Sequence, residues 1–157
     1  MNIFVTSSCP VECARNLCDR RVIKMVLESA QMLSTALREH GVDVGYKSTH
    51  KNHPSNVWAR ETRANWNWLY KHAMALCKEY TKRYNKIHKS QAVIESLYAH
   101  ISSIPDGNLT QFANCAANQS IGVSYKHFDN VCVAYQLYLN DRWDTDKRTP
   151  TWFGEGR

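Results

Sequence analysis

The sequence predicts a mainly α protein, a single compact helical domain over residues 1–157 with a short extended N-terminal segment and long ordered loops. Two stretches, residues 14–40 and 56–84, repeat apolar side chains with the period of an α-helix. Only residues 2–6 have the pattern of an extended segment, and a lone strand cannot form a sheet. The chain of 157 residues is long enough to bury one hydrophobic core.

The first long helix is expected within residues 14–40, after a short helical start at Pro10. Gly41 follows this stretch and is typical of a helix C-terminus. Asp19 falls on the apolar face if the helix is continuous, and a buried carboxylate must be paired or must cap a helix. A break in the helix near Cys18 and Asp19, with the Asp19 side chain capping a helix that begins at Arg20, is the simplest explanation. The apolar face consists of Cys18, Val22, Val26, Ala30, Leu33 and Leu37.

Glu28 lies on the opposite face of this helix, where Arg21 and Lys24 flank it at helical spacing. The three side chains form either a solvated, salt-bridged surface or a carboxylate held among cations at the edge of a cleft. The spacing alone is compatible with both interpretations.

Further helices are expected over residues 56–84, as one helix or two, and over 90–102 and 126–141. Pro54 marks the start of the first of these, with Ser55 or Asn56 as its cap. Residues 108–124 are weakly patterned and are expected to be mostly loop. The C-terminal Trp152 and Phe153 are too apolar for a free terminus, so we expect them to dock on the body, with docking on a ligand as the alternative.

One stripe of the 56–84 stretch combines apolar residues with Glu61, Asn65 and His72, so these three are expected to face inward. Buried polar groups need partners, and three on one stripe favour a polar cavity. Each of them alone is more often a polar residue satisfied within the core. The other face is basic and is either a solvated surface or a surface that follows a phosphate backbone. Its members include Arg60, Lys71 and Lys78.

Residues 50–68 combine histidine, arginine, glutamate, asparagine and tryptophan in a mixture that a core helix does not need. Aromatic rings stack on bases, arginine pairs with phosphate, and glutamate or histidine transfers protons. The net charge of +6 also suits an anionic partner, either nucleic acid or a nucleotide. Stacking on a base is assigned to Trp58, Trp66 or Trp68.

The pairs Cys9/Cys13 and His50/His53 supply ligand types found in zinc sites. The two pairs are far apart, and a helix is expected to start between the cysteines. We therefore expect no metal and no cofactor. No apolar run is long enough to span a membrane, and the N-terminus lacks the pattern of a signal peptide, so a cytoplasmic protein is expected. Motifs of common NTPases, hydrolases and metalloproteases are absent.

Three stretches carry a resemblance to a known family. They are residues 18–33 (CDRRVIKMVLESAQML), residues 49–65 (THKNHPSNVWARETRAN) and residues 150–153 (PTWF). Together they resemble a group of small phage and bacterial proteins that is placed with the pyrimidine-dimer DNA glycosylase (endonuclease V) family. The similarity to the small proteins extends over nearly the whole chain. The link to characterised glycosylases rests on similar size, an all-α pattern, an early arginine-containing helix and the tail.

The resemblance implies a mechanism in which the N-terminal α-amine attacks C1′ of a damaged nucleotide, assisted by a glutamate on an early helix. An iminium intermediate forms, and β-elimination then cuts the strand. Members of the family expose a threonine amine after removal of methionine. Here Asn2 follows the initiator, and methionine is normally retained before so large a residue, so the free amine is expected on Met1. Alignment on the early arginine places the glutamate near Val22, and Glu28 is the nearest carboxylate further along.

The leading prediction is therefore a DNA glycosylase/AP-lyase-like enzyme that acts on the N-glycosidic bond of damaged or modified nucleotides. One alternative is an enzyme that acts on a free nucleotide or a nucleotide-derived signal, and another is a non-catalytic phage-type protein that sequesters such a ligand. Catalytic groups are expected among Glu28, Glu61, Met1 and Asp19. Ligand-binding residues are expected among Arg21, Lys24, His50, His53, Trp58, Arg60, Asn65 and His72.

Overall fold

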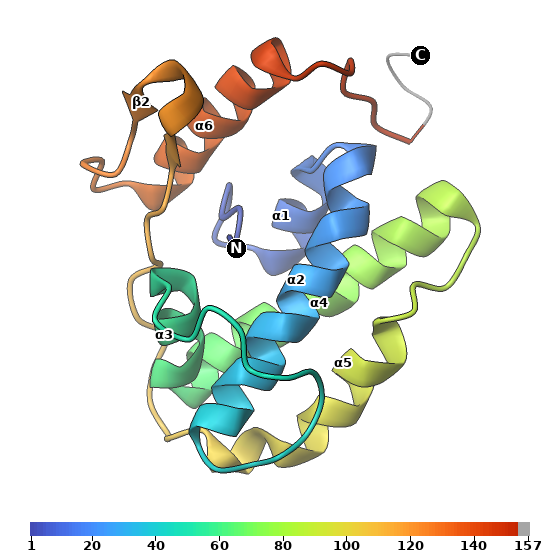
Figure 1. The fold of residues 1–157 in the computed structure, drawn as a ribbon, viewed down its shortest axis with the longest axis vertical. Helices are drawn as coiled ribbons and strands as arrows, with labels where there is room; N and C mark the ends of the chain where they lie inside the picture. The colour runs from blue at the N-terminus through green and yellow to red at the C-terminus, as the bar shows by residue number, and fades with distance from the viewer. Residues whose placement is uncertain (154–157) are drawn as a thin grey trace.

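In the computed structural model, which describes residues 1–153, two long helices form the centre of the fold (Figure 1). Helix α2 (Asp19–Glu39) packs along α4 (Arg63–Tyr84), and the short α1 (Pro10–Asn16) also packs on α4. All six residues of the apolar face predicted for the first long helix are buried, since each is at most 2% exposed. The helical period therefore identified the buried face of α2 correctly.

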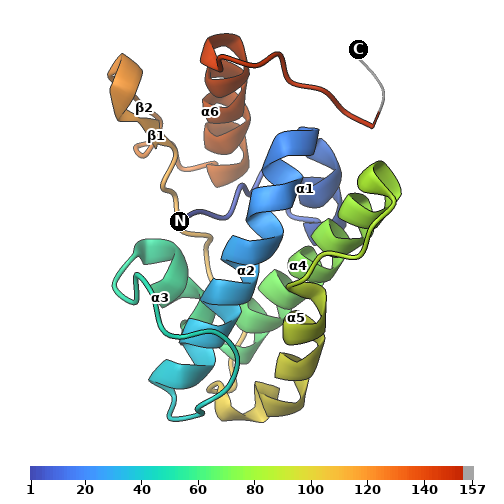
Figure 2. The same cartoon turned by 45° about the vertical axis from the view of Figure 1, so that its right-hand side comes forward.

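The remaining helices surround this pair, and the mainly α prediction is confirmed. Helix α3 (Pro54–Glu61) contacts α2 and α4, as does α5 (Gln91–Leu97), which continues into the 3₁₀ helix η1 (Tyr98–Ser103). Strands β1 (Ala117–Asn118) and β2 (Val123–Ser124) form a small antiparallel hairpin around the 3₁₀ helix η2 (Gln119–Ile121). Helix α6 (Val131–Thr145) follows the hairpin, and Figure 2 shows both above the rest of the body.

The extended N-terminal segment lies inside the fold, between α6 and the helical body (Figures 1 and 2). Ile3, Phe4 and Val5 are at most 8% exposed. The ring of Phe4 stacks on Tyr138 of α6, with centroids 6.0 Å apart. The segment is therefore core structure, and it joins α6 to the other helices.

Several helix boundaries differ from the expected ones because side chains outside the periodic pattern cap the helices. His53, and neither Ser55 nor Asn56, is the N-cap of α3, and its Nδ1 accepts a hydrogen bond from the Ser55 amide. Helix α6 begins at Val131 after the cap Asn130, whereas the apolar pattern suggested a start at residue 126. The break predicted near Cys18 and Asp19 is present, and Gly41 has the positive φ of 86° that suits a helix C-terminus.

The C-terminal tail docks on the body, as the sequence predicted. The indole of Trp152 packs edge-on against Trp143 and donates a hydrogen bond to the carbonyl of Asn16. The amide of Phe153 donates to Asp19, and its half-exposed ring lies 4.6 Å from the ammonium of Lys82. The tail thus connects the end of α6 to the start of α2.

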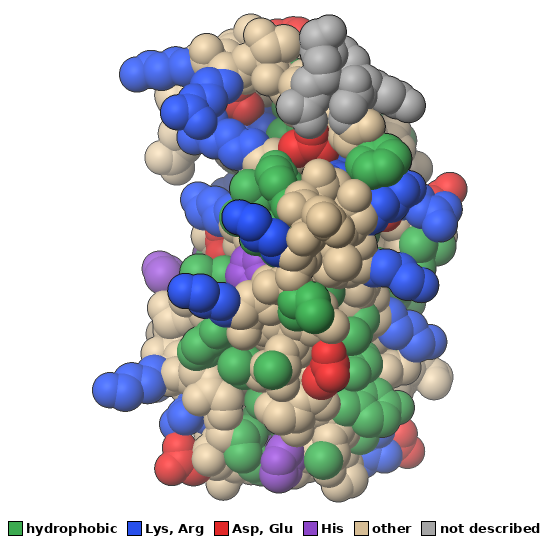
Figure 3. All heavy atoms as spheres, turned by 90° about the vertical axis from the view of Figure 1, so that its right-hand side faces the viewer, with side chains coloured by type: hydrophobic (Ala, Val, Ile, Leu, Met, Phe, Trp, Pro, Cys, Tyr) green, Lys and Arg blue, Asp and Glu red, His purple; other side chains and the backbone are tan. Residues whose placement is uncertain are grey.

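Lysine and arginine side chains are spread over the face shown in Figure 3, and apolar side chains gather in its lower half. This distribution agrees with the net charge of +6. Within residues 1–153, no helix combines the length and apolar character that crossing a bilayer requires.

Candidate active site

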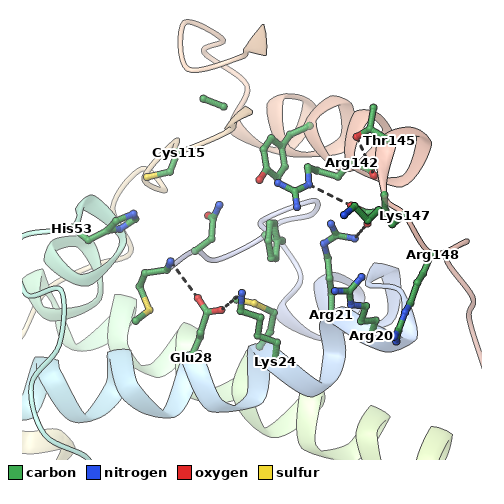
Figure 4. Close-up of a pocket in the computed structure, with 17 residues that line it drawn as sticks. Arg20, Arg21, Lys24, Glu28, His53, Cys115, Arg142, Thr145, Lys147 and Arg148 are labelled. Atoms are coloured by element: carbon green, nitrogen blue, oxygen red, sulfur yellow. Dashed lines mark hydrogen bonds and ion pairs between the residues drawn. The ribbon is translucent and has the colours of Figure 1, made fainter. Parts of the chain in front are cut away.

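A cleft with a volume of about 880 Å³ lies between the N-terminal half of α2 and the C-terminal part of α6 (Figure 4). The N-terminal segment forms part of its floor through Met1, Asn2 and Phe4. The volume is within the range of small-molecule and nucleotide sites. The N-terminal residue Met1 therefore lines the cleft.

The α-amine of Met1 and the carboxylate of Glu28 form an ion pair on the cleft floor. The nitrogen lies 3.4 Å from Oε1 of Glu28, and Nζ of Lys24 lies 3.8 Å from Oε2. Glu28 is only 9% exposed, whereas the Lys24 side chain is 77% exposed. A primary amine can act as a nucleophile once it is deprotonated, and a carboxylate beside it can accept or donate a proton.

Hydrogen bonds fix the position of this amine. The Tyr135 hydroxyl donates to Oδ1 of Asn2 at 2.7 Å, and Nε2 of Gln136 donates to the carbonyl of Thr6 at 2.9 Å. Asn16 also donates to the Thr6 hydroxyl. Since these bonds join the segment to α1 and α6, the amine is held in place before any ligand binds.

Basic side chains line both sides of the cleft. Arg20, Arg21 and Lys24 come from α2, and Arg142, Lys147 and Arg148 come from α6 and the segment after it. Asp146 connects the two sides. Its carboxylate lies 2.9 Å from Nη1 of Arg21 and 3.6 Å from Nε of Arg142. The excess of positive charge makes the cleft suitable for the phosphates of a nucleic acid.

His53 and Cys115 also line the cleft, on the side of Glu28 away from the labelled arginines and lysines (Figure 4). Partial burial is the main cause that lowers the pKa of His53, and the positive N-terminal amine lowers it further. Because Nδ1 of His53 accepts the Ser55 amide proton, Nε2 is the ring nitrogen left for a ligand.

Five of the residues predicted from the sequence come together in this cleft. They are Met1, Arg21, Lys24, Glu28 and His53. Of the two interpretations of Glu28, the structure agrees with the carboxylate at the edge of a cleft. The chemical roles of these five residues remain predictions.

Asp19 does not line the cleft, and it is the first residue of α2 where a cap was expected, which corrects the expected role. Cys18 is the N-cap residue, and its side chain makes no capping hydrogen bond. Its buried carboxylate lies 3.1 Å from Nη1 of Arg83 and accepts hydrogen bonds from the Thr151 hydroxyl and the Phe153 amide. Asp19 therefore holds the C-terminal tail.

The polar cavity expected around Glu61, Asn65 and His72 does not form. Glu61 is exposed at the end of α3 and does not face inward. The Asn65 side chain donates to the Trp58 carbonyl and the Thr110 hydroxyl and accepts from the Thr110 amide. His72 is buried, with Nδ1 3.0 Å from the Pro10 carbonyl. Asn65 and His72 therefore have hydrogen-bond partners within the core, which agrees with the alternative interpretation.

The expected aromatic platform is also corrected, because the tryptophans pack in the core. Trp58, Trp66 and Trp68 are at most 7% exposed, and their indole nitrogens donate to backbone carbonyls. His50 is exposed and hydrogen bonds to Thr49, while Arg60 donates to the Lys51 carbonyl. Neither His50 nor Arg60 lines the cleft.

Sequence reasoning missed one complete side of the cleft. It comprises Tyr138, Arg142, Thr145, Asp146, Lys147 and Arg148. The dense run of charged residues at 141–148 was the available signal, but no local pattern connects it to α2. Arg20, next to the predicted Arg21, was also missed.

The zinc-type residues do not form a site. Cys9 is exposed, and the buried Cys13 donates from Sγ to the Ser7 carbonyl. In the part of the chain that the structure describes, no group of three or more His, Cys, Asp or Glu side chains is placed to hold a metal ion.

Comparison with known proteins gives one match. The model of the family described as pyrimidine dimer DNA glycosylase matches residues 1–92, which is more than half of the chain. The matched part contains the amine, Glu28 and His53, and the side of the cleft formed by α6 lies outside it. No curated protein and no solved structure matches the chain.

Proposed function

The chain belongs to the pyrimidine dimer DNA glycosylase family, and from this premise we propose that it is a DNA glycosylase with AP-lyase activity whose nucleophile is the α-amine of Met1. The observation that carries the proposal is the contact of 3.4 Å between this amine and Glu28 on the floor of a basic cleft.

In the proposed reaction the ammonium group of the ion pair first releases a proton to solvent. The lone pair of the resulting amine forms a bond to C1′ of the damaged nucleotide, and the base leaves with the electron pair of the C1′–N bond. The nitrogen then loses a second proton, and its lone pair forms the C=N bond of an iminium ion as the C1′–O4′ bond breaks. The positive charge of the iminium ion is stabilised by the Glu28 carboxylate. Glu28 then removes a proton from C2′, so that the C3′–O3′ bond breaks and the strand is cut. The carboxylate thus acts as both an electrostatic partner and a base.

The substrate is proposed to be duplex DNA because cations lie on both sides of the cleft. A single nucleotide needs only one or two such contacts, whereas a strand that crosses the cleft passes the cations of α2 and those after α6. The damaged nucleotide must leave the base stack before its C1′ can reach the floor. The volume of about 880 Å³ is large enough for an extruded nucleotide.

A free nucleotide is the second candidate, since the same volume suits a mononucleotide. This alternative predicts tight binding of a mononucleotide that does not weaken steeply with salt. DNA binding predicts the reverse, because each phosphate contact adds to the salt dependence.

The test is borohydride trapping of the purified protein with DNA that carries an abasic site or a pyrimidine dimer. We expect a covalent adduct at the amine of Met1, located by mass spectrometry of the N-terminal peptide. Glu28→Gln should lower the rate of strand cleavage about 100-fold or more, which is the usual size of an acid–base contribution. The fold, checked by circular dichroism, should be unchanged.

Glu61→Gln is the matched control, because Glu61 is exposed and lies outside the cleft. It should keep the wild-type cleavage rate. An adduct on another residue, or equal cleavage by Glu28→Gln and wild type, would reject the proposed mechanism.

A further inference from the structure

We propose that His53 is the hydrogen-bond donor to the sugar ring oxygen O4′, acting through Nε2–H while the C1′–O4′ bond breaks. The inference rests on the proposed function, because it assigns a residue to the iminium-forming step of that reaction. It gives a specific role to His53, which the sequence predicted only as a ligand-binding residue.

The position of His53 at the start of α3 fixes which ring nitrogen carries the proton. The Ser55 amide can only donate, and its nitrogen lies 3.1 Å from Nδ1 of His53. Nδ1 is therefore unprotonated, and the single proton of the neutral ring is on Nε2. The backbone amide of His53 donates to the His50 carbonyl, which holds the cap in place. The ring thus presents an N–H donor to the cleft.

The surroundings of the ring favour its neutral form. Partial burial is the main cause of the lowered pKa of His53, and the charges of the N-terminal amine, His50 and Lys126 lower it further, while Glu28 acts in the opposite direction. The N-terminus of α3 also disfavours a cation at this position. At neutral pH the side chain is consequently a neutral donor and a weak partner for phosphate compared with the arginines.

The layout of the cleft separates this donor from the phosphate-binding side chains. In Figure 4 the labelled arginines and lysines lie on one side of Glu28, and His53 lies on the other with Cys115. If C1′ of the sugar faces the amine, its phosphates are directed toward the arginines and lysines. The opposite side of the sugar then faces His53. O4′ is bonded to C1′, so it is the sugar oxygen nearest to the point of attack.

The chemistry of the step requires a donor at O4′. When the amine attacks C1′, the base leaves with the electron pair of the C1′–N bond and takes a proton from solvent. The attacking nitrogen then gives a proton to Glu28. Its lone pair forms the C=N bond of the iminium ion as the C1′–O4′ pair moves to O4′, which receives that proton from Glu28. The Nε2–H of His53 stabilises the negative charge on O4′ and keeps its own proton.

Two substitutions separate the donor from the helix cap. His53→Asn places an amide oxygen near Nδ1 and keeps the acceptor for Ser55, but it removes the donor at Nε2. His53→Gln places an amide N–H near the position of Nε2. With dimer-containing duplex at saturation, we expect His53→Asn to lower the single-turnover rate of borohydride trapping about tenfold or more. His53→Gln should recover most of this loss, and the dissociation constant for DNA should change less than about twofold.

A duplex with an acyclic aldehyde in place of the sugar has no ring oxygen to release. On this substrate His53→Asn should form the adduct at the wild-type rate, which a general distortion of the site would not allow. Equal rates of His53→Asn and wild type on dimer DNA would overturn the inference, as would a weakened dissociation constant with an unchanged rate. If wild type forms no adduct with any substrate, the proposed function fails and this inference fails with it.

Discussion

At the scale of single residues, the buried polar side chains Asn65 and His72 of α4 hydrogen bond within the core and do not line the cleft. His72 illustrates this. Its Nδ1 hydrogen bonds to the Pro10 carbonyl, and its ring stacks on Trp68 with centroids 5.5 Å apart. Complete burial lowers the pKa of His72 to about 4, and the bond to Pro10 opposes the shift only in part. The residue joins α4 to α1 as a neutral ring.

This burial predicts an acid-dependent loss of stability. Between pH 6.5 and about 4 the unfolded chain binds a proton at His72 that the folded chain does not bind, so falling pH favours unfolding. The difference corresponds to about 3 kcal/mol in total at about 1.4 kcal/mol per pKa unit. His72→Asn keeps a donor toward Pro10 but does not titrate. In urea unfolding at several pH values, the variant should lose less stability than wild type over this range.

Parallel pH profiles of the two proteins would contradict the prediction. Carboxylates also titrate below pH 5, so only the difference between the profiles reports on His72.

At the scale of elements, the tail is tied to the N-terminal end of α2 through one carboxylate. Asp19 is 5% exposed and binds Arg83, Thr151 and Phe153. The Asp19 amide also donates to the Thr151 carbonyl at 2.8 Å. Since Lys147 and Arg148 precede this attachment and line the cleft, the attachment positions one side of the candidate site.

Removing this carboxylate should destabilise the protein. Asp19→Ala leaves the buried guanidinium of Arg83 with Glu79 as its remaining ion-pair partner among those described, so we expect a loss of about 3 kcal/mol in the free energy of unfolding. Thr151→Val removes one hydrogen bond and should cost about 1 kcal/mol. Urea denaturation measures both.

Asp144→Asn is the control, because Asp144 is exposed, and its effect should stay within about 0.5 kcal/mol. An Asp19→Ala variant as stable as this control would show that the tail contributes little to the fold.

At the scale of the whole molecule, basic side chains lie on two surfaces that could bind DNA, the cleft and the exposed face of α4. The basic face of α4 was one candidate for DNA binding, and Lys71 and Lys78 are indeed exposed there. They do not line the cleft that contains the amine. Arg20 and Arg148 do, and they come from opposite ends of the chain.

Binding measured against salt concentration should distinguish the two surfaces. Arg20→Ala and Arg148→Ala should each weaken duplex binding and reduce the slope of log K against log salt by about 1, as expected for one lost phosphate contact. Lys71→Ala and Lys78→Ala, with the same change of charge, should leave affinity and slope at wild-type values. The opposite pattern would move the DNA-binding surface to α4.

The fold was largely predictable because local spacing encodes it. The apolar face of α2, the start at Pro10, the break before Asp19 and the turn at Gly41 all follow from side chains within a few positions of one another. The helix caps at His53 and Asn130 were missed, because capping depends on backbone geometry that the apolar pattern does not contain.

The candidate site was only partly predictable. The sequence by itself determined that the protein is helical, that Glu28 lies among cations on one face of α2, and that Trp152 and Phe153 dock. Only the tertiary structure decided that the amine of Met1 meets Glu28, that residues 142–148 form the opposite side of the cleft, and that Asn65 and His72 belong to the core. The physical reason is that helical periodicity gives the direction of a side chain on its own helix. Which chain segment covers that side chain depends on contacts between separate elements, such as Met1 with Glu28 and Arg21 with Asp146.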